Sequence, residues 1–284
     1  MLSRQRLHEY RAQTFRYAPG RNLKSQDEAV AFVNERGFVF FWPIQGVLLP
    51  NLWVAVAGDR PVADEHDDPG HRTWGWKDAL LGQRQWYYAK VLRKKGTMIA
   101  MDVAPLFYAL TENYGSLEDD YLTLYEQGRL TLESKLVYEA LLQGGPLDTI
   151  TLRKAARLSG PDSGSRFERA LSELQADFKI LPVGTTEAGA WHYSYAFDIV
   201  ARHYPELPEQ ARFIGELDAR HKLAELYIRS VGAAQERDLT KLFGWLPPQA
   251  QRAIEGLVKA GVVQEGEKVE GQSGEWFALA ELVG

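Results

Sequence analysis

The sequence predicts an α+β protein, mostly helical, that is built from tandem winged helix-turn-helix modules. Residues 131–192 contain three helical runs followed by two strand-like pieces around a small loop, which is the element order of that module. A second copy of the pattern occupies the end of the chain. An N-terminal region that ends in a basic hairpin completes the prediction of three modules, over residues 1–125, 126–205 and 206–284.

The composition is that of a globular protein, with 45% apolar and 25% charged residues. Because no run approaches 18 apolar residues and the N-terminus carries no apolar segment, we expect no membrane span, no secretory signal and a cytoplasmic location. The sequence has no cysteine, which excludes disulfides, cysteine-ligated zinc and a thiol nucleophile. A net charge of −5 argues against non-specific binding of nucleic acid over the whole surface, but it permits binding through a local basic patch.

Positive charge is concentrated in two segments. Residues 1–24 carry six Arg or Lys against one Glu, and residues 71–96 carry seven against one Asp. Each cluster is either a phosphate-binding patch or an ordinary solvated face. Whether the N-terminal stretch, the tip at 93–95 and the third helix at Arg166 line one groove is the observation that would best separate these interpretations.

The first elements follow from local signals. An aromatic and arginine-rich helix is predicted over 7–16, and Ser25 to Glu28 form a capping box that begins a second helix. The apolar run 38–42 predicts a buried strand, and 52–56 predicts a short helix. A polar loop is expected over 59–73, followed by a short helix after Trp74 to Asp78.

The segment 64–71 brings carboxylates and imidazoles close together, so a metal ion is conceivable there. Its spacing matches no ligand motif. The prediction is therefore a solvated loop, with no metal and no cofactor.

Two aromatic and β-branched runs, 86–92 and 97–101, flank a short basic segment and predict a β-hairpin. The turn contributes Arg93, Lys94 and Lys95, and Gly96 permits tight geometry. We expect these cations to contact phosphates. The alternative is a solvated turn.

Tryptophan is dense between the first strand and the hairpin. Most of these side chains must belong to the core, but a few at a cleft could stack on an extruded base. The candidates are Trp42, Trp74 and Trp76.

The middle module has basic residues on its second and third helical runs. The candidates for nucleic-acid contact are Arg153, Lys154, Arg166 and Arg169. Arg166 stands at the start of the third helix, where the free amides and the helix dipole also favour phosphate. The alternative is that these arginines pair with the acidic residues of the same helix.

The last module repeats the middle one at an offset of 87 residues in its first two helices and 83 in its third. Before this module, a helix is expected over 197–203 and a linker over 205–208. The first helix of the module is expected over 210–230 and should pack across domains. Its wing carries four glutamates against one lysine, so this copy suits a structural role better than phosphate binding.

The segments Gly37 to Trp42, Pro43 to Gly58 and Trp74 to Asp78 resemble the winged-helix DNA glycosylases that unhook interstrand crosslinks and excise alkylated bases (AlkZ/YcaQ-like). They are especially similar to a related branch of that family. The resemblance implies tandem winged helices, DNA as the partner and a possible glycosylase activity.

In those enzymes a Leu-Gly-x-Val strand leads into Gln-x-Gln or Gln-x-Asp, which activates water. Aligning Gly37 places Phe40 and Trp42 at the two catalytic positions. Aligning Gln45 with the first glutamine places Val47 at the second. Either register breaks the motif, which leaves Gln45 as the catalytic candidate.

Three hypotheses follow. The favoured one is a non-catalytic protein that binds duplex or damaged DNA, with no membrane partner and no small-molecule cofactor. The second is a glycosylase with a rearranged site, in which Asp64, Glu65 or Asp78 substitutes for the missing groups. The third is a protein-interaction scaffold, which the acidic pI and the acidic last wing favour.

Overall fold

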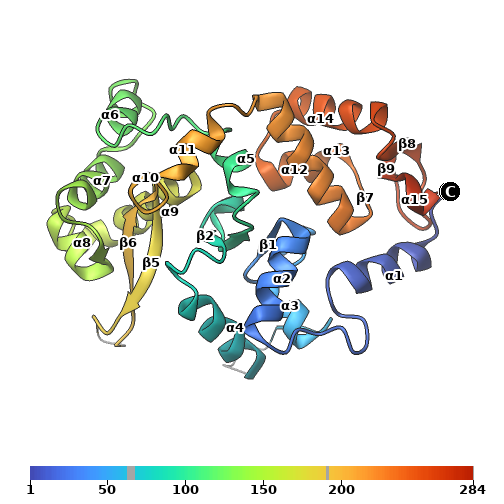
Figure 1. Cartoon of the computed structure of the whole chain (residues 1–284), viewed down its shortest axis with the longest axis horizontal. Coiled ribbons are helices and arrows are strands. Elements are labelled where there is room, and N and C mark those ends of the chain that lie inside the picture. Colours follow the sequence, from blue (N-terminus) through green and yellow to red (C-terminus); the bar gives the residue numbers. More distant parts are fainter. Residues whose placement is uncertain (63–67, 190–191, 284) are drawn as a thin grey trace.

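The computed structural model describes residues 1–62, 68–189 and 192–283. The described residues form an α+β structure that is about half helical and contains three small antiparallel sheets of three strands each (Figure 1). The α+β prediction is therefore confirmed.

The N-terminal part begins with two helices and a strand. Its elements are α1 (Arg4–Thr14), α2 (Gln26–Arg36), β1 (Phe38–Phe40), α3 (Leu52–Ala57), α4 (Asp68–Ala79), β2 (Tyr87–Ala89), the short 3₁₀ turn η1 (Leu92–Lys94) and β3 (Thr97–Ile99). The Ser25 hydroxyl caps α2 by accepting the Glu28 amide at 3.2 Å. The Glu28 carboxylate accepts the Lys24 amide, one residue before the cap, at 2.7 Å.

The largest departure from the predicted elements lies in this part. A polar loop was expected to reach residue 73, but α4 already begins at Asp68 and contains Trp74 to Asp78. The loop was predicted from the polar residues of this segment, yet polar residues and a proline are compatible with a first helical turn, because the amide there has no intrahelical partner. Residues 63–67 of the expected loop lie outside the described part.

The middle part contains the stretch that predicted the module. Its elements are α5 (Ala104–Tyr108), α6 (Asp119–Glu126), α7 (Leu132–Gly144), β4 (Leu147–Asp148), α8 (Thr149–Ala155), η2 (Pro161–Ser163), α9 (Gly164–Ala176), β5 (Ile180–Thr186), β6 (Ser194–Ile199) and α10 (Val200–His203). A helix was expected from Phe197, but Phe197 and Ile199 still belong to β6 and pair with Pro182 and Ile180. Their burial in the sheet overrides the local helical pattern.

The last part repeats these elements. They are α11 (Glu206–Ala211), α12 (Glu216–Val231), β7 (Ala233–Ala234), α13 (Glu236–Phe243), α14 (Pro247–Lys259), β8 (Val263–Glu267), β9 (Trp276–Leu279) and α15 (Ala280–Val283). The bounds of α14 lie 83 residues after those of α9, and α13 starts 87 residues after α8, which confirms the repeat. The expected linker is instead the helix α11, and α12 starts at Glu216 rather than near 210.

The three sheets share one topology. Their strand orders are β1-β3-β2, β4-β6-β5 and β7-β9-β8, so in each the first strand pairs with the third and the third with the second. In all three, a helix precedes the first strand and two helices separate it from the hairpin. The N-terminal part therefore follows the same order as the two copies that the sequence showed to be related.

The core has two parts. One hydrophobic cluster joins the N-terminal part to the last part and also includes Phe107, Phe178 and Tyr204 of the middle part. In this cluster the Phe38 ring meets the Phe107 and Phe243 rings edge-on, at 5.3 and 5.8 Å. The middle part has a cluster of its own, around Val137 and Leu174. Figure 1 shows the middle helices on one side, with β1 and α2 nearer to α12 and α13. The shared core thus fixes the first and last parts against each other.

Candidate nucleic-acid interface

The basic turn of the first hairpin projects from a rigid base. The strands β2 and β3 pair in antiparallel register, as the sequence predicted. The Thr97 hydroxyl accepts the Leu92 amide at 3.1 Å and donates to the Lys95 carbonyl at 2.8 Å. Arg93 and Lys94 have left-handed backbones, with φ of 57° and 54°. The side chains of Arg93, Lys94 and Lys95 are all exposed at this tip.

The hairpin tip packs against helix α9 of the middle part. The Lys90 amide donates to Gln175 Oε1 at 3.1 Å, and the Lys90 ammonium donates to Ser172 Oγ at 3.4 Å. Lys94 Nζ lies 3.7 Å from Glu173 Oε1. These contacts cover the C-terminal half of α9, so the half that precedes Ser172 remains open for a ligand.

The open half of α9 carries two exposed arginines. Arg166 pairs with Glu133 at 2.9 Å, and Arg169 pairs with Glu173 at 2.9 Å. Their side chains are 59% and 75% exposed, and ion pairs at such exposure contribute only about 0–1 kcal/mol. Phosphate can therefore compete with both carboxylates. We call the set Arg93, Lys94, Lys95, Arg166 and Arg169 the basic tip surface.

The two candidates on α8 differ in their surroundings. Arg153 Nε donates to the Leu158 carbonyl at 2.7 Å, and its Nη2 donates to the Gly160 carbonyl at 3.3 Å. This guanidinium holds the turn that leads into α9. Lys154 is exposed on the same helix. The structure brings the hairpin tip and α9 together and gives Arg153 contacts that stabilise the turn.

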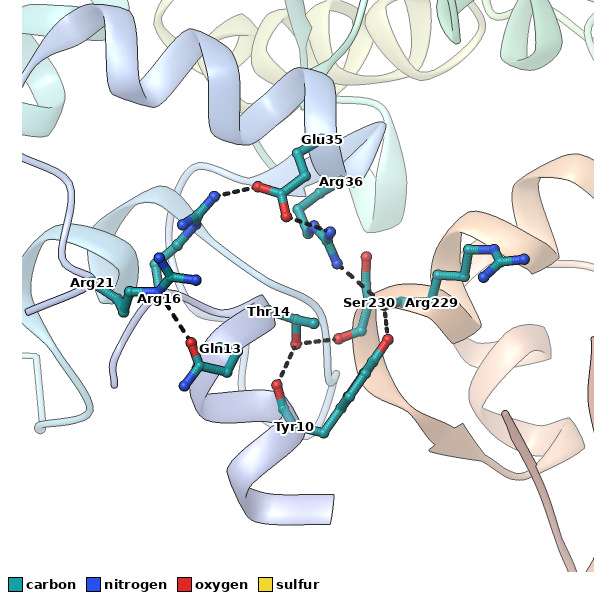
Figure 2. Close-up of polar contacts among 9 residues, drawn as sticks. All are labelled: Tyr10, Gln13, Thr14, Arg16, Arg21, Glu35, Arg36, Arg229 and Ser230. Atoms are coloured by element: carbon teal, nitrogen blue, oxygen red, sulfur yellow. Dashed lines mark hydrogen bonds and ion pairs between the residues drawn. The ribbon is translucent and has the colours of Figure 1, made fainter. Parts of the chain in front are cut away.

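The N-terminal basic stretch lies elsewhere, across the C-terminal end of α12 (Figures 1 and 2). The Tyr10 hydroxyl donates to the Arg229 carbonyl at 2.7 Å, and the Thr14 hydroxyl donates to the Ser230 carbonyl at 2.7 Å. Arg11 Nε and Nη2 donate to the carbonyls of Val231 and Ala233 at 2.8 and 3.1 Å. The carbonyls of Arg229, Ser230 and Val231 belong to the last turn of α12, which leaves them without an intrahelical partner, and Ala233 belongs to β7. We call this set of contacts the α12 seam.

The residues that the resemblance places at the catalytic positions when Gly37 is aligned, Phe40 and Trp42, pack among other apolar side chains. Phe40 is fully buried in β1. Trp42 is partly buried and packs on Phe41 and Trp53, with ring centroids 5.6 and 5.7 Å apart. Gln45 is exposed in the loop that follows. The Phe40 and Trp42 side chains have no group that could activate water.

The other two tryptophan candidates belong to α4. Trp76 is partly buried against the main core, whereas Trp74 is 43% exposed. Trp74 Nε1 donates to the Tyr193 hydroxyl at 3.2 Å, and its ring meets Phe41 edge-on at 5.5 Å. The Trp74 ring is thereby held at the border between the first and middle parts.

A buried lysine beneath Trp74 was missed by sequence reasoning. Lys77 is fully buried, and its ammonium lies 4.4 Å from the Trp74 ring centroid and 4.6 Å from that of Tyr195. It also donates to Tyr195 and, at 2.5 Å, to Asp78. Burial lowers the pKa of Lys77, and the Asp78 carboxylate opposes that shift. The cluster ties α4 to β6, a contact between residues more than 100 positions apart that no local pattern reveals.

A cleft of about 670 Å³ opens beside the basic tip surface, where the three parts of the chain meet. We call it the junction cleft. Its cationic side chains are Arg93, Lys94, Arg129, Lys179 and Arg220. Its carboxylates are Glu112 and Asp177. Positive charge thus exceeds negative in this cleft, although the whole chain has a net charge of −5.

A smaller cleft of about 420 Å³ lies between α1 and the loop 43–49, and Gln45 is not among its lining residues. Within residues 1–62, 68–189 and 192–283, no three His, Cys, Asp or Glu side chains gather as metal ligands. Residues 64–67 of the segment considered for a metal lie outside that range. Across the described residues, no helix is both long and apolar enough to cross a membrane.

Comparisons with known proteins agree with this architecture. A family model described as "AlkZ related" matches residues 23–244. Among solved structures, the Streptomyces sahachiroi DNA glycosylase AlkZ is similar, with a TM-score of 0.57 and 16% sequence identity. That match covers 99% of this chain and 71% of the glycosylase chain. No protein with a curated description matches the sequence.

Proposed function

We propose that this chain, which belongs to the AlkZ-related family, is a DNA-repair protein that binds duplex or damaged DNA through its basic tip surface. We further propose that the three parts with a common strand order are winged helix-turn-helix modules, with η1 as the wing tip of the first. A wing and a third helix are the elements with which such modules contact DNA.

The observation that carries the proposal is the meeting of the first wing with the third helix of the middle module. Lys94 lies 3.7 Å from Glu173, which also binds Arg169, so cations of two modules share one surface. The rest of the chain is acidic, and a concentrated patch of this kind attracts a phosphate backbone. The N-terminal stretch lies apart from this surface, beside the end of α12 (Figure 1), and its Arg11 donates within the α12 seam.

Binding without base excision fits the residues at the positions of the catalytic motif. Phe40 is fully buried and Trp42 packs on Trp53. The alternative, a glycosylase with a rearranged site, rests on the family relation and on Gln45. Release of free base from alkylated or crosslinked duplex would establish that alternative, and loss of the release in Gln45→Ala would assign it to Gln45.

The test of DNA binding is its dependence on salt. Replacing Arg93, Lys94 and Lys95 together by Gln should weaken duplex binding. It should also make the slope of log K against log salt shallower by about 0.9 for each phosphate that the variant no longer neutralises. The slope is measured by fluorescence anisotropy across a salt series.

The matched control removes three charges from the N-terminal stretch. Arg4, Arg21 and Lys24 are exposed, and their replacement by Gln changes the net charge by the same amount. We expect this variant to keep the wild-type slope. Wild-type binding that is absent or independent of salt would contradict the proposal and favour a protein-interaction scaffold.

A further inference from the structure

The junction cleft contains a buried cation with unused hydrogen-bonding capacity. Lys179 lines the cleft and is only 3% exposed. Its ammonium donates to Asn113 Oδ1 at 2.7 Å, and among the described residues this is its single hydrogen bond. An ammonium group has three donors, and a buried charge without an ion pair is costly. A negatively charged ligand would supply the missing acceptors.

The ammonium of Lys179 is withdrawn from water at the wall of the cleft. Burial lowers the pKa of Lys179, although nearby carboxylates act in the opposite direction. This shift disfavours the charged form of Lys179. A bound anion would favour the charged form of Lys179.

The cleft also offers an apolar, aromatic floor. Phe107, Phe178 and Leu242 line it and are nearly or fully buried. On another wall, the Trp245 ring stacks on Phe243 at 4.2 Å, and the Arg220 guanidinium lies 5.0 Å from its centroid. A ligand that fits this lining combines an anionic group with a flat, apolar ring.

The cleft continues the basic tip surface, because Arg93 and Lys94 belong to both. A strand whose phosphates follow the tip is therefore led to the cleft entrance. A volume of about 670 Å³ is in the range of small-ligand pockets and admits one nucleotide rather than a duplex.

We propose that the junction cleft binds one unpaired nucleotide, with its phosphate at Lys179 and its base against the aromatic floor. This inference rests on the proposed DNA binding and defines the preferred DNA as one with an unpaired residue. A free nucleotide has the same chemistry, so the experiment must separate the two sources.

The experiment compares a fully paired duplex with the same duplex carrying a one-nucleotide bulge, by fluorescence anisotropy at equal salt. Wild type should bind the bulged duplex about tenfold more tightly, since one stacked base contributes that order of affinity. Lys179→Met should bind both duplexes equally, at the paired-duplex affinity of wild type. Lys259→Met changes an exposed lysine outside the cleft and should keep the preference.

Lys179→Gln is a second variant that controls for misfolding of Lys179→Met. The glutamine removes the charge, but its side-chain amide can still donate to Asn113. It should also abolish the preference, and both variants should melt at or above the wild-type temperature because a buried charge is removed. A preference that survives in both variants would overturn the inference.

Equal wild-type affinity for the two duplexes, with normal salt dependence, would overturn the inference and leave the proposed function standing. Absence of binding to either duplex would overturn both. A third arm uses free deoxyadenosine monophosphate, which should compete with the bulged duplex only. Binding of the free nucleotide that requires Lys179, without any preference for the bulge, would assign the cleft to a free ligand and exclude its role on DNA.

Discussion

Replacing Arg11 by Met should separate the structural arginines of the N-terminal stretch from DNA-binding ones. The guanidinium donates to the carbonyls of Val231 and Ala233 at 2.8 and 3.1 Å. It also places positive charge at the C-terminal end of α12. Methionine keeps much of the aliphatic packing but leaves both carbonyls without this donor. Burial lowers the pKa of Arg11, which shows that the charge is partly desolvated and offsets some of the gain.

Two charge-assisted hydrogen bonds at a partly buried site contribute about 2–3 kcal/mol after that offset. For a chain of this size, such a change lowers the melting temperature by roughly 5–10 °C. Calorimetry measures the melting temperature, and the salt series measures DNA binding. We expect the melting temperature to fall while the salt slope stays at the wild-type value.

Arg21→Met is the matched control, because Arg21 is exposed and bonds the Gln13 side chain at 3.1 Å. It removes the same charge from the same segment and should leave the melting temperature unchanged. The reasoning would be refuted if Arg11→Met left the stability intact. A salt slope reduced by about 0.9 would equally refute it, since Arg11 would then contact a phosphate.

Two further predictions concern stability. Burial raises the pKa of Tyr193 to about 12 from its ordinary value of 10.0. The unfolded chain therefore loses the Tyr193 proton at a lower pH than the folded chain does. The urea concentration at the unfolding midpoint should be constant below about pH 10 and should fall between about pH 10 and pH 12. A midpoint that rises over this range would contradict the prediction. Gly232 has φ of 78°, and a Cβ there would lie 2.9 Å from Tyr10 Cδ1, so Gly232→Ala should cost about 1–3 kcal/mol in urea unfolding. If Gly232→Ala were as stable as wild type, the side chains around residue 232 would move aside for a Cβ without cost, and the prediction would be wrong.

Much of the fold was predictable because its signals are local. The Ser25 cap, the apolar run at 38–42 and the repeat at offsets of 87 and 83 depend on residues near one another in sequence. The structure confirms the cap, the strand and the repeat. The strands β4 and β7 were not predicted, since two residues are too few to show an alternating pattern.

The start of α4 was predicted wrongly for a different reason. A polar segment with a proline is compatible both with a loop and with a first helical turn, and the loop was predicted from the sequence. Packing against the middle part favours the helix over the loop. In the helix, Lys77 is fully buried and donates a hydrogen bond to Tyr195 of β6. The middle hairpin that supplies this partner is remote in sequence.

The sequence by itself determined the kinds of elements, their repetition and the identity of the candidate cations. It also predicted that either register of the resemblance breaks the catalytic motif, because residue identity needs no coordinates. The tertiary structure decided which cations lie close together. The basic turn at residues 93–95 packs against α9, and Arg11 donates to carbonyls at the end of α12. Charge is a property of residues, but a binding surface depends on long-range packing, which brings residues from separate modules within a few ångströms.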